Sequence, residues 1–65
     1  MKLQLHQIIQ IIRKRKGYSQ EYVAENAKIS ISTYRRIENG ENVGSHYLQQ
    51  VINCLDIQIV ALCFS

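Results

Sequence analysis

The 65-residue chain contains no proline and no tryptophan, and it has only three glycines and two cysteines. Without proline or a low-complexity tract, no linker between domains is expected, and the length allows one small domain. A membrane-spanning helix needs about 20 consecutive apolar residues, which this sequence does not offer. The start at Met1 leads into no signal-type segment. We therefore expect a soluble cytoplasmic protein with no membrane partner.

The residues that carry catalysis or hold metals in other proteins are few and scattered here. Cys54 and Cys63 are expected to be reduced thiols rather than a disulfide. Together with His6 and His46, they lack the close spacing of a metal site. The glycines are isolated, so they form no phosphate-binding loop, and no nucleophile elbow is present. We expect no enzyme activity, no metal and no cofactor.

Positive charge is confined to one half of the chain. All eight Lys and Arg lie in residues 1–36, which contain only two acidic side chains. Residues 37–65 contain three acidic side chains and no Lys or Arg. A basic half is typical of a surface that binds a polyanion. The run from Arg13 to Lys16 also has a simpler interpretation, a solvated helix end that suits the helix dipole.

The spacing of apolar residues predicts four helices. The first is expected to run from Leu3 to about Lys16, where Gly17 follows as a stop signal. The other three are expected to begin at serine caps, which are Ser19, Ser30 and Ser45. The second and third helices are joined by a short turn, which makes them a helix-turn-helix.

The predicted third helix has two unlike faces. At about 100° per residue, Tyr34 and Ile37 share the side that must face the core. The opposite side presents a hydroxyl, two guanidinium groups and an amide, from Ser32, Arg35, Arg36 and Asn39. Arginine can donate two hydrogen bonds to guanine, and serine can bond a base or a phosphate. The alternative is that these are ordinary solvated residues of a small helix.

Residues 57–65 are rich in β-formers and are predicted to form a strand that is apolar on both faces. An unpaired strand at an exposed edge promotes aggregation, so this strand needs a partner. A second copy of the chain would supply it through an interface of Ile57, Ile59, Val60, Leu62 and Phe64. The alternative is that the segment folds back onto its own helices.

The order of residues around the helix-turn-helix resembles the Cro and phage-repressor, or XRE-type, family. The matching elements are Ile12-Arg13, the basic run, Gly17, Ser19-Gln20, Val23-Ala24, Ile29-Ser30 and Ile37-Glu38-Asn39-Gly40. The resemblance covers about residues 9 to 55. It implies an all-α, lambda-repressor-like domain of four helices over residues 1–56. It also implies a repressor that binds double-stranded DNA.

The resemblance implies a role for individual residues. The base-contacting positions match Ile31, Ser32 and Arg36. Phosphate contacts are expected from Gln20, Lys28, Thr33, Arg35, Asn39 and Lys14. Arg13 and Glu38 match a pair that bridges the first and third helices inside the domain.

Two positions depart from the family pattern. Lys28 stands in the turn where the family usually has glycine, and a left-handed backbone there would cost on the order of 1 kcal/mol. Tyr22 stands where a charged or amide side chain is usual, and it is expected to pack.

Many family members continue with a fifth helix that forms a dimer, whereas this sequence has the strand predicted over residues 57–65. That arrangement resembles HipB-type antitoxins, in which C-terminal strands pair across a two-fold axis. It implies a homodimer on palindromic DNA and a toxin partner, a HipA-like kinase. The alternatives are a phage-type repressor, a restriction–modification controller, and a toxin-binding module for which DNA is secondary.

Overall fold

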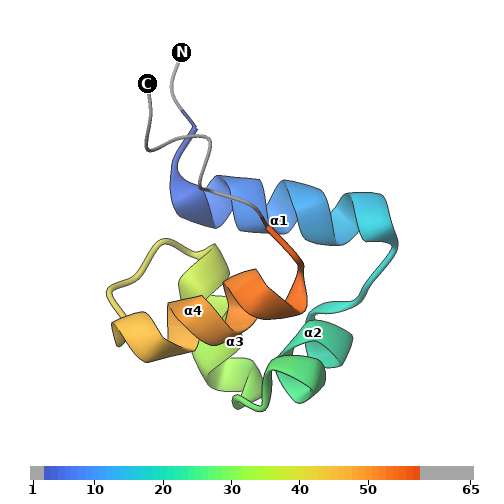
Figure 1. Ribbon diagram of the computed structural model, residues 1–65. Helices are drawn as coiled ribbons and strands as arrows, with labels where there is room; N and C mark the ends of the chain where they lie inside the picture. The colour runs from blue at the N-terminus through green and yellow to red at the C-terminus, as the bar shows by residue number, and fades with distance from the viewer. Residues whose placement is uncertain (1–2, 58–65) are drawn as a thin grey trace.

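The computed structural model describes residues 3–57, and within them the chain forms four α-helices and no strand. The helices are α1 (Leu5–Lys16), α2 (Gln20–Ala27), α3 (Ile31–Glu38) and α4 (Ser45–Cys54). α2 packs on both α3 and α4, and α1 packs on α3 (Figure 1). The predicted all-α helical domain is therefore confirmed. No helix in the described part of the chain is long and apolar enough to cross a bilayer.

The apolar face of each helix contributes to one core. Its buried apolar members are Ile9, Val23, Ala24, Ala27, Tyr34, Ile37, Val51, Ile52 and Leu55. Tyr34 and Ile37, predicted for the inner side of the third helix, are 0% and 1% exposed. The inner side of α3 is thereby fixed against its neighbours, so its outer side is presented in a defined orientation.

Two of the predicted serine caps are present. The Ser19 hydroxyl accepts a hydrogen bond from the Tyr22 backbone N–H at 3.0 Å and begins α2. The Ser30 hydroxyl accepts one from the Thr33 backbone N–H at 3.1 Å and begins α3. Each hydroxyl satisfies an N–H group that has no partner within its helix.

Two predicted helix starts were wrong. α1 begins at Leu5 rather than Leu3, after a capping residue whose backbone N–H donates to the Gln7 side chain at 2.8 Å. α4 is capped by Gly44 rather than Ser45. The Gly44 carbonyl already accepts the first hydrogen bond of α4, at 3.1 Å, so the Ser45 hydroxyl lies one residue too late to cap.

Each of the four described helices is followed, within two residues of its last residue, by a residue with a left-handed backbone. These residues are Gly17, Lys28, Gly40 and Asp56, with φ of 77°, 61°, 81° and 56°. In each case the next N–H donates to the carbonyl five residues earlier, as from Ile29 to Ala24 at 3.0 Å. This is the Schellman arrangement, which satisfies carbonyls left open at a helix end.

Gly40 meets a second constraint, because the loop after α3 lies against α1. A Cβ at this position would come within 2.9 Å of the His6 ring on α1. Glycine suits this position because it adopts the left-handed backbone without steric cost, and because a larger residue would force the His6 ring to move.

Only one residue of the expected dimer interface, Ile57, lies within the described residues. It is half-buried against the core of its own chain, and its backbone N–H donates to the Ile52 carbonyl at 3.0 Å. Ile57 thus takes part in the turn that closes α4. Ile59, Val60, Leu62 and Phe64 lie outside the described residues, as does the strand predicted for that segment.

The left-handed backbone of Lys28 leads to a test of stability. Lys28→Gly is expected to raise the free energy of unfolding by about 0.5 kcal/mol, because glycine removes the steric cost of this backbone and offsets part of that gain by its own flexibility. Urea denaturation measures the change. Lys28→Ala keeps the left-handed cost and is expected to give no gain. Equal stabilisation by both variants would show that the side chain, not the backbone, is unfavourable.

Candidate nucleic-acid interface

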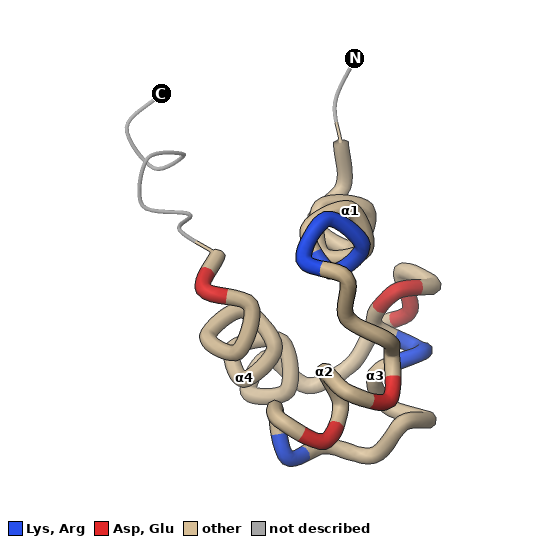
Figure 2. Tube along the Cα trace, turned by 90° about the vertical axis from the view of Figure 1, so that its right-hand side faces the viewer, with Lys and Arg blue, Asp and Glu red and all other residues tan. Residues whose placement is uncertain are grey.

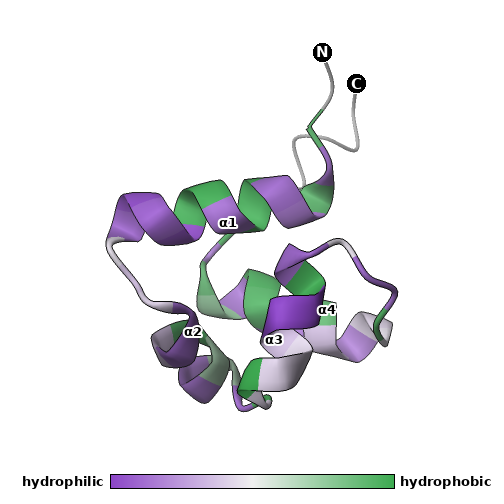
Figure 3. Ribbon diagram, turned by 180° about the vertical axis from the view of Figure 1, so that it is seen from behind, coloured by the Kyte–Doolittle hydropathy of each residue, from purple (hydrophilic) through white to green (hydrophobic). Residues whose placement is uncertain are grey.

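The outer side of α3 is polar and exposed. Ser32, Arg35 and Arg36 are all exposed, and Asn39 follows directly after the helix. Figure 3 shows strongly hydrophilic segments in the second half of α3. The outer side of α3 therefore exposes hydrogen-bond donors to solvent, while its inner side is buried in the core.

Two side chains in the first turn of α3 are less exposed to solvent than the two arginines of the second turn. Ile31 is half-buried and packs against the core. Thr33 is also half-buried, and its hydroxyl accepts a hydrogen bond from the Ser30 hydroxyl at 2.9 Å. Both residues were expected at the DNA surface, and both also stabilise the start of the helix.

Each arginine of α3 is paired with a carboxylate, which the sequence analysis did not predict. Arg35 Nη2 lies 3.4 Å from Glu21 Oε2 on α2. Arg36 Nε lies 3.4 Å from Glu41 Oε1 in the loop after α3. The four side chains are between 51% and 68% exposed, so these pairs are screened by water and add little to stability.

A different ion pair is buried beneath this surface. The structure brings Arg13 of α1 and Glu38 of α3 together, with Arg13 Nε donating to Glu38 Oε2 at 2.6 Å and Nη2 donating to Oε1 at 3.3 Å. Arg13 Nη1 also donates to the Tyr18 carbonyl at 2.8 Å. The two side chains are only 10% and 3% exposed. One guanidinium thus ties α3 to α1 and to the start of α2.

Two further donors complete the environment of Glu38. The Tyr34 hydroxyl, one helical turn earlier, donates to Oε2. Gln20 Nε2, in the first turn of α2, donates to Oε1 at 2.9 Å. Gln20 was expected to contact phosphate, and here its amide is oriented by Glu38. Tyr34 was predicted only as a core residue, although its spacing of four residues from Glu38 was a signal for this contact.

These contacts shift the pKa values of the groups involved. Burial alone would raise the pKa of Glu38, but the hydrogen bonds from Arg13, Tyr34 and Gln20 outweigh it and hold that pKa below its usual range. The hydrogen bond to Glu38 raises the pKa of Arg13. Burial, together with the nearby carboxylate, raises the pKa of Tyr34. Both members of the pair are therefore charged at neutral pH.

The remaining expected phosphate contacts are exposed. Lys14 lies in the last turn of α1, and Lys28 lies in the turn between α2 and α3. Figure 2 shows positive segments at the end of α1 and at α3, with acidic segments next to those of α3. The charge of the surface is therefore mixed at α3 and positive at the end of α1.

Tyr22 packs as expected, but only on the surface. Its ring centroid lies 4.6 Å from that of Tyr18, and the residue is 47% exposed. The contact stabilises the connection between α1 and α2 without adding to the core.

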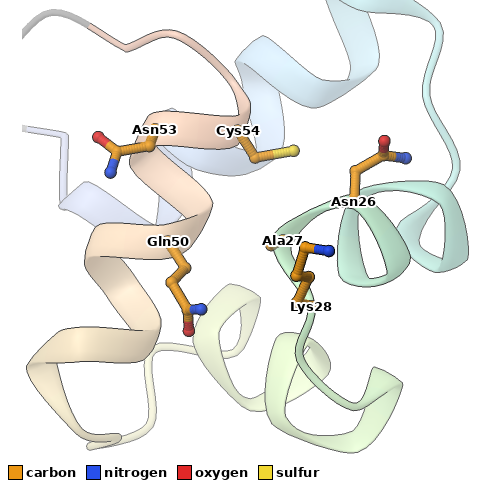
Figure 4. A pocket seen from close by; sticks show the side chains of 6 residues that line it. All are labelled: Asn26, Ala27, Lys28, Gln50, Asn53 and Cys54. Atoms are coloured by element: carbon orange, nitrogen blue, oxygen red, sulfur yellow. The ribbon is translucent and has the colours of Figure 1, made fainter.

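An open hollow of about 320 Å³ lies between the end of α2 and α4 (Figure 4). It is lined by Asn26, Ala27, Lys28, Gln50, Asn53 and Cys54. Burial raises the pKa of the Cys54 thiol, which keeps it protonated at neutral pH. Within residues 3–57 there is no group of three His, Cys, Asp or Glu side chains that could hold a metal.

Comparison with known families identifies the class of this protein. A family model described as helix-turn-helix matches residues 9–62, most of the chain. The chain belongs to the helix-turn-helix family, and within it to the DNA-binding transcription regulators of the XRE type. Comparison with curated proteins gave no significant match, and neither did comparison with solved structures.

The buried carboxylate leads to a prediction about pH. Glu38→Gln is expected to lower the free energy of unfolding by about 3 kcal/mol at pH 7, because it leaves Arg13 buried without its counter-ion. Folding lowers the pKa of Glu38. The charged carboxylate therefore contributes fully to the free energy of unfolding above its unfolded pKa of about 4.3, and this contribution is lost as the pH falls through the pKa of Glu38 in the folded protein. Urea denaturation from neutral to acidic pH should show the two proteins converging below about pH 4.

Two variants control this measurement. Glu25→Gln removes an exposed carboxylate of α2 and is expected to change stability by less than about 0.5 kcal/mol. Tyr34→Phe keeps the ion pair, removes one donor, and is expected to cost about 1–2 kcal/mol. A stability difference between wild type and Glu38→Gln that stays constant with pH would contradict the assigned role of the charge.

Proposed function

We propose that this protein is a homodimeric repressor that binds palindromic DNA with the outer side of α3. The observation that carries the proposal is the exposure of Ser32, Arg35 and Arg36 on a helix whose inner side is buried. The ion pair of Glu38 with Arg13 supports it further, because it holds α3 against the rest of the domain. A rigid helix with exposed donors suits recognition in the major groove.

The side chains divide by the part of DNA that each would contact. Arg36 would donate to a guanine, Ser32 to a base, and Ile31 would pack on a thymine methyl. Phosphate contacts are assigned to Gln20, Lys28, Thr33, Arg35, Asn39 and Lys14. Phosphate contacts set orientation and affinity, whereas base contacts set sequence preference.

The size of α3 supports a dimer. Its eight residues span about 12 Å, so one helix contacts only a few base pairs. Two copies about 34 Å apart would contact successive major grooves of a palindrome. The sequence after α4 is apolar and could form a contact between subunits. For this dimer interface we propose Ile57, Ile59, Val60, Leu62 and Phe64.

We place an antitoxin role within this proposal. Its support is the resemblance of residues 57–65 to the paired strands of HipB-type antitoxins, and the partner would be a HipA-like kinase. Repression of its own gene would then be one of two activities, the other being inhibition of the toxin. A phage-type repressor and a restriction–modification controller have the same DNA-binding surface and differ only in the partner.

Selection from random duplex DNA at physiological salt, with mass determination of the bound species, tests the proposal. We expect a palindromic consensus bound by two chains. The matched control is the chain shortened by residues 58–65, which retains Ile57 and therefore the closed end of α4. It is expected to bind as single chains with lower affinity. A wild-type protein that enriches no sequence would overturn the proposal and favour a protein-binding module.

Arg36 and Lys14 should differ in what they contribute to binding. Arg36→Ala is expected to cost about 1–3 kcal/mol on the selected site and to relax preference at one base pair. Lys14→Ala is expected to reduce the salt dependence of binding by about one phosphate contact, with preference unchanged. Titrations of selected and random duplexes at several salt concentrations separate the two. Equal weakening on both duplexes by Arg36→Ala would reassign Arg36 to phosphate.

A further inference from the structure

Glu41 lies in the loop just after α3 and is held there by a backbone hydrogen bond. Its N–H donates to the Arg36 carbonyl at 2.9 Å, as part of the turn that ends α3 at the left-handed Gly40. Its carboxylate Oε1 lies 3.4 Å from Arg36 Nε. The corresponding position after a helix usually makes an apolar contact back to the same helix residue. Here an ion pair takes the place of that contact.

The side of the guanidinium that Glu41 engages determines what the rest of Arg36 can do. A pair through Nε leaves the edge formed by Nη1 and Nη2 for another partner. That edge carries two parallel donors, which match the O6 and N7 acceptors of guanine. An arginine held in this way approaches a base pair end-on with its orientation already restricted.

Arg35 faces its carboxylate through the other side of the guanidinium. Its pair with Glu21 uses a terminal nitrogen, Nη2, and the distance to Glu21 Oε2 is 3.4 Å. The outer edge that would be needed for a guanine is therefore partly occupied. The two neighbouring arginines of α3 are thus distinguished by which nitrogen faces a carboxylate.

We infer that Glu41 is a positioning residue for sequence recognition, which holds Arg36 toward a guanine and away from the DNA backbone. The inference rests on the proposed function. A carboxylate beside the DNA surface repels phosphates, so it lowers affinity for every sequence, and an exposed pair contributes little to stability. Glu41 instead improves discrimination between sequences. An Arg36 side chain of restricted mobility loses less entropy when it binds the correct base, and it contacts fewer phosphates in other sequences.

The test compares binding of the full chain to the duplex selected for it and to duplexes of equal length with one base pair replaced. We expect Glu41→Gln to bind random duplex more tightly than wild type does. At the base pair contacted by Arg36, its discrimination is expected to fall about two- to fivefold, in line with the small coupling energy of an exposed ion pair. Because all duplexes carry the same charge, general electrostatic effects cancel in the ratio. Its urea unfolding midpoint is expected to match that of wild type.

Glu21→Gln is the matched control, since it removes the other exposed carboxylate paired with an α3 arginine. It is expected to tighten binding to random duplex while leaving discrimination unchanged. Unchanged discrimination in Glu41→Gln, or an equal loss in both variants, would overturn the inference.

A double variant tests whether Glu41 acts through Arg36. In an Arg36→Ala background, Glu41→Gln is expected to cause no further loss of discrimination at that base pair. A further loss of similar size would overturn the inference, because Glu41 would then act independently. A wild-type chain without sequence preference would overturn the proposed function and this inference with it, whereas preserved preference in Glu41→Gln overturns only the inference.

Discussion

The buried carboxylate of Glu38 is the interaction on which the rest of the domain depends. Its two oxygens accept hydrogen bonds from Arg13, Tyr34 and Gln20, one side chain from each of α1, α3 and α2. A buried charge is tolerated only when its hydrogen-bonding capacity is filled, and within residues 3–57 no buried side-chain nitrogen or oxygen lacks a partner. Small helices without long apolar faces are thereby fixed in relative orientation by directional bonds as well as by packing.

The proposed DNA surface lies directly on this network. Gln20 donates to Glu38 from the start of α2, and Tyr34 and Glu38 fix α3 from its inner side. The exposed residues of α3 are therefore held at a defined distance and rotation relative to the start of α2. On the outer side, the arginines are paired with Glu21 and Glu41. The buried network thus fixes the orientation of α3, and the two exposed carboxylates reduce the net positive charge of its outer side.

Helix termination sets the limits of the domain. The same left-handed ending follows each described helix, with glycine at two positions and Lys28 and Asp56 at the others. This repeated ending keeps four short helices from extending, since each terminal turn is closed by backbone bonds. The last of these endings includes Ile57, whose backbone N–H donates to the Ile52 carbonyl.

Local patterns in the sequence were sufficient to predict most of the fold. The period of apolar residues, the caps Ser19 and Ser30, and glycine at helix ends act through neighbouring residues alone, so the helices and the exposed side of α3 followed from them. The family resemblance in the order of residues also predicted the pairing of Arg13 with Glu38. Only the tertiary structure decided which donors surround Glu38, and that Glu21 and Glu41 pair with Arg35 and Arg36, because those contacts depend on side-chain directions across helices and turns. Periodicity places a residue on a face, whereas the packing of one helix on another determines which atoms meet.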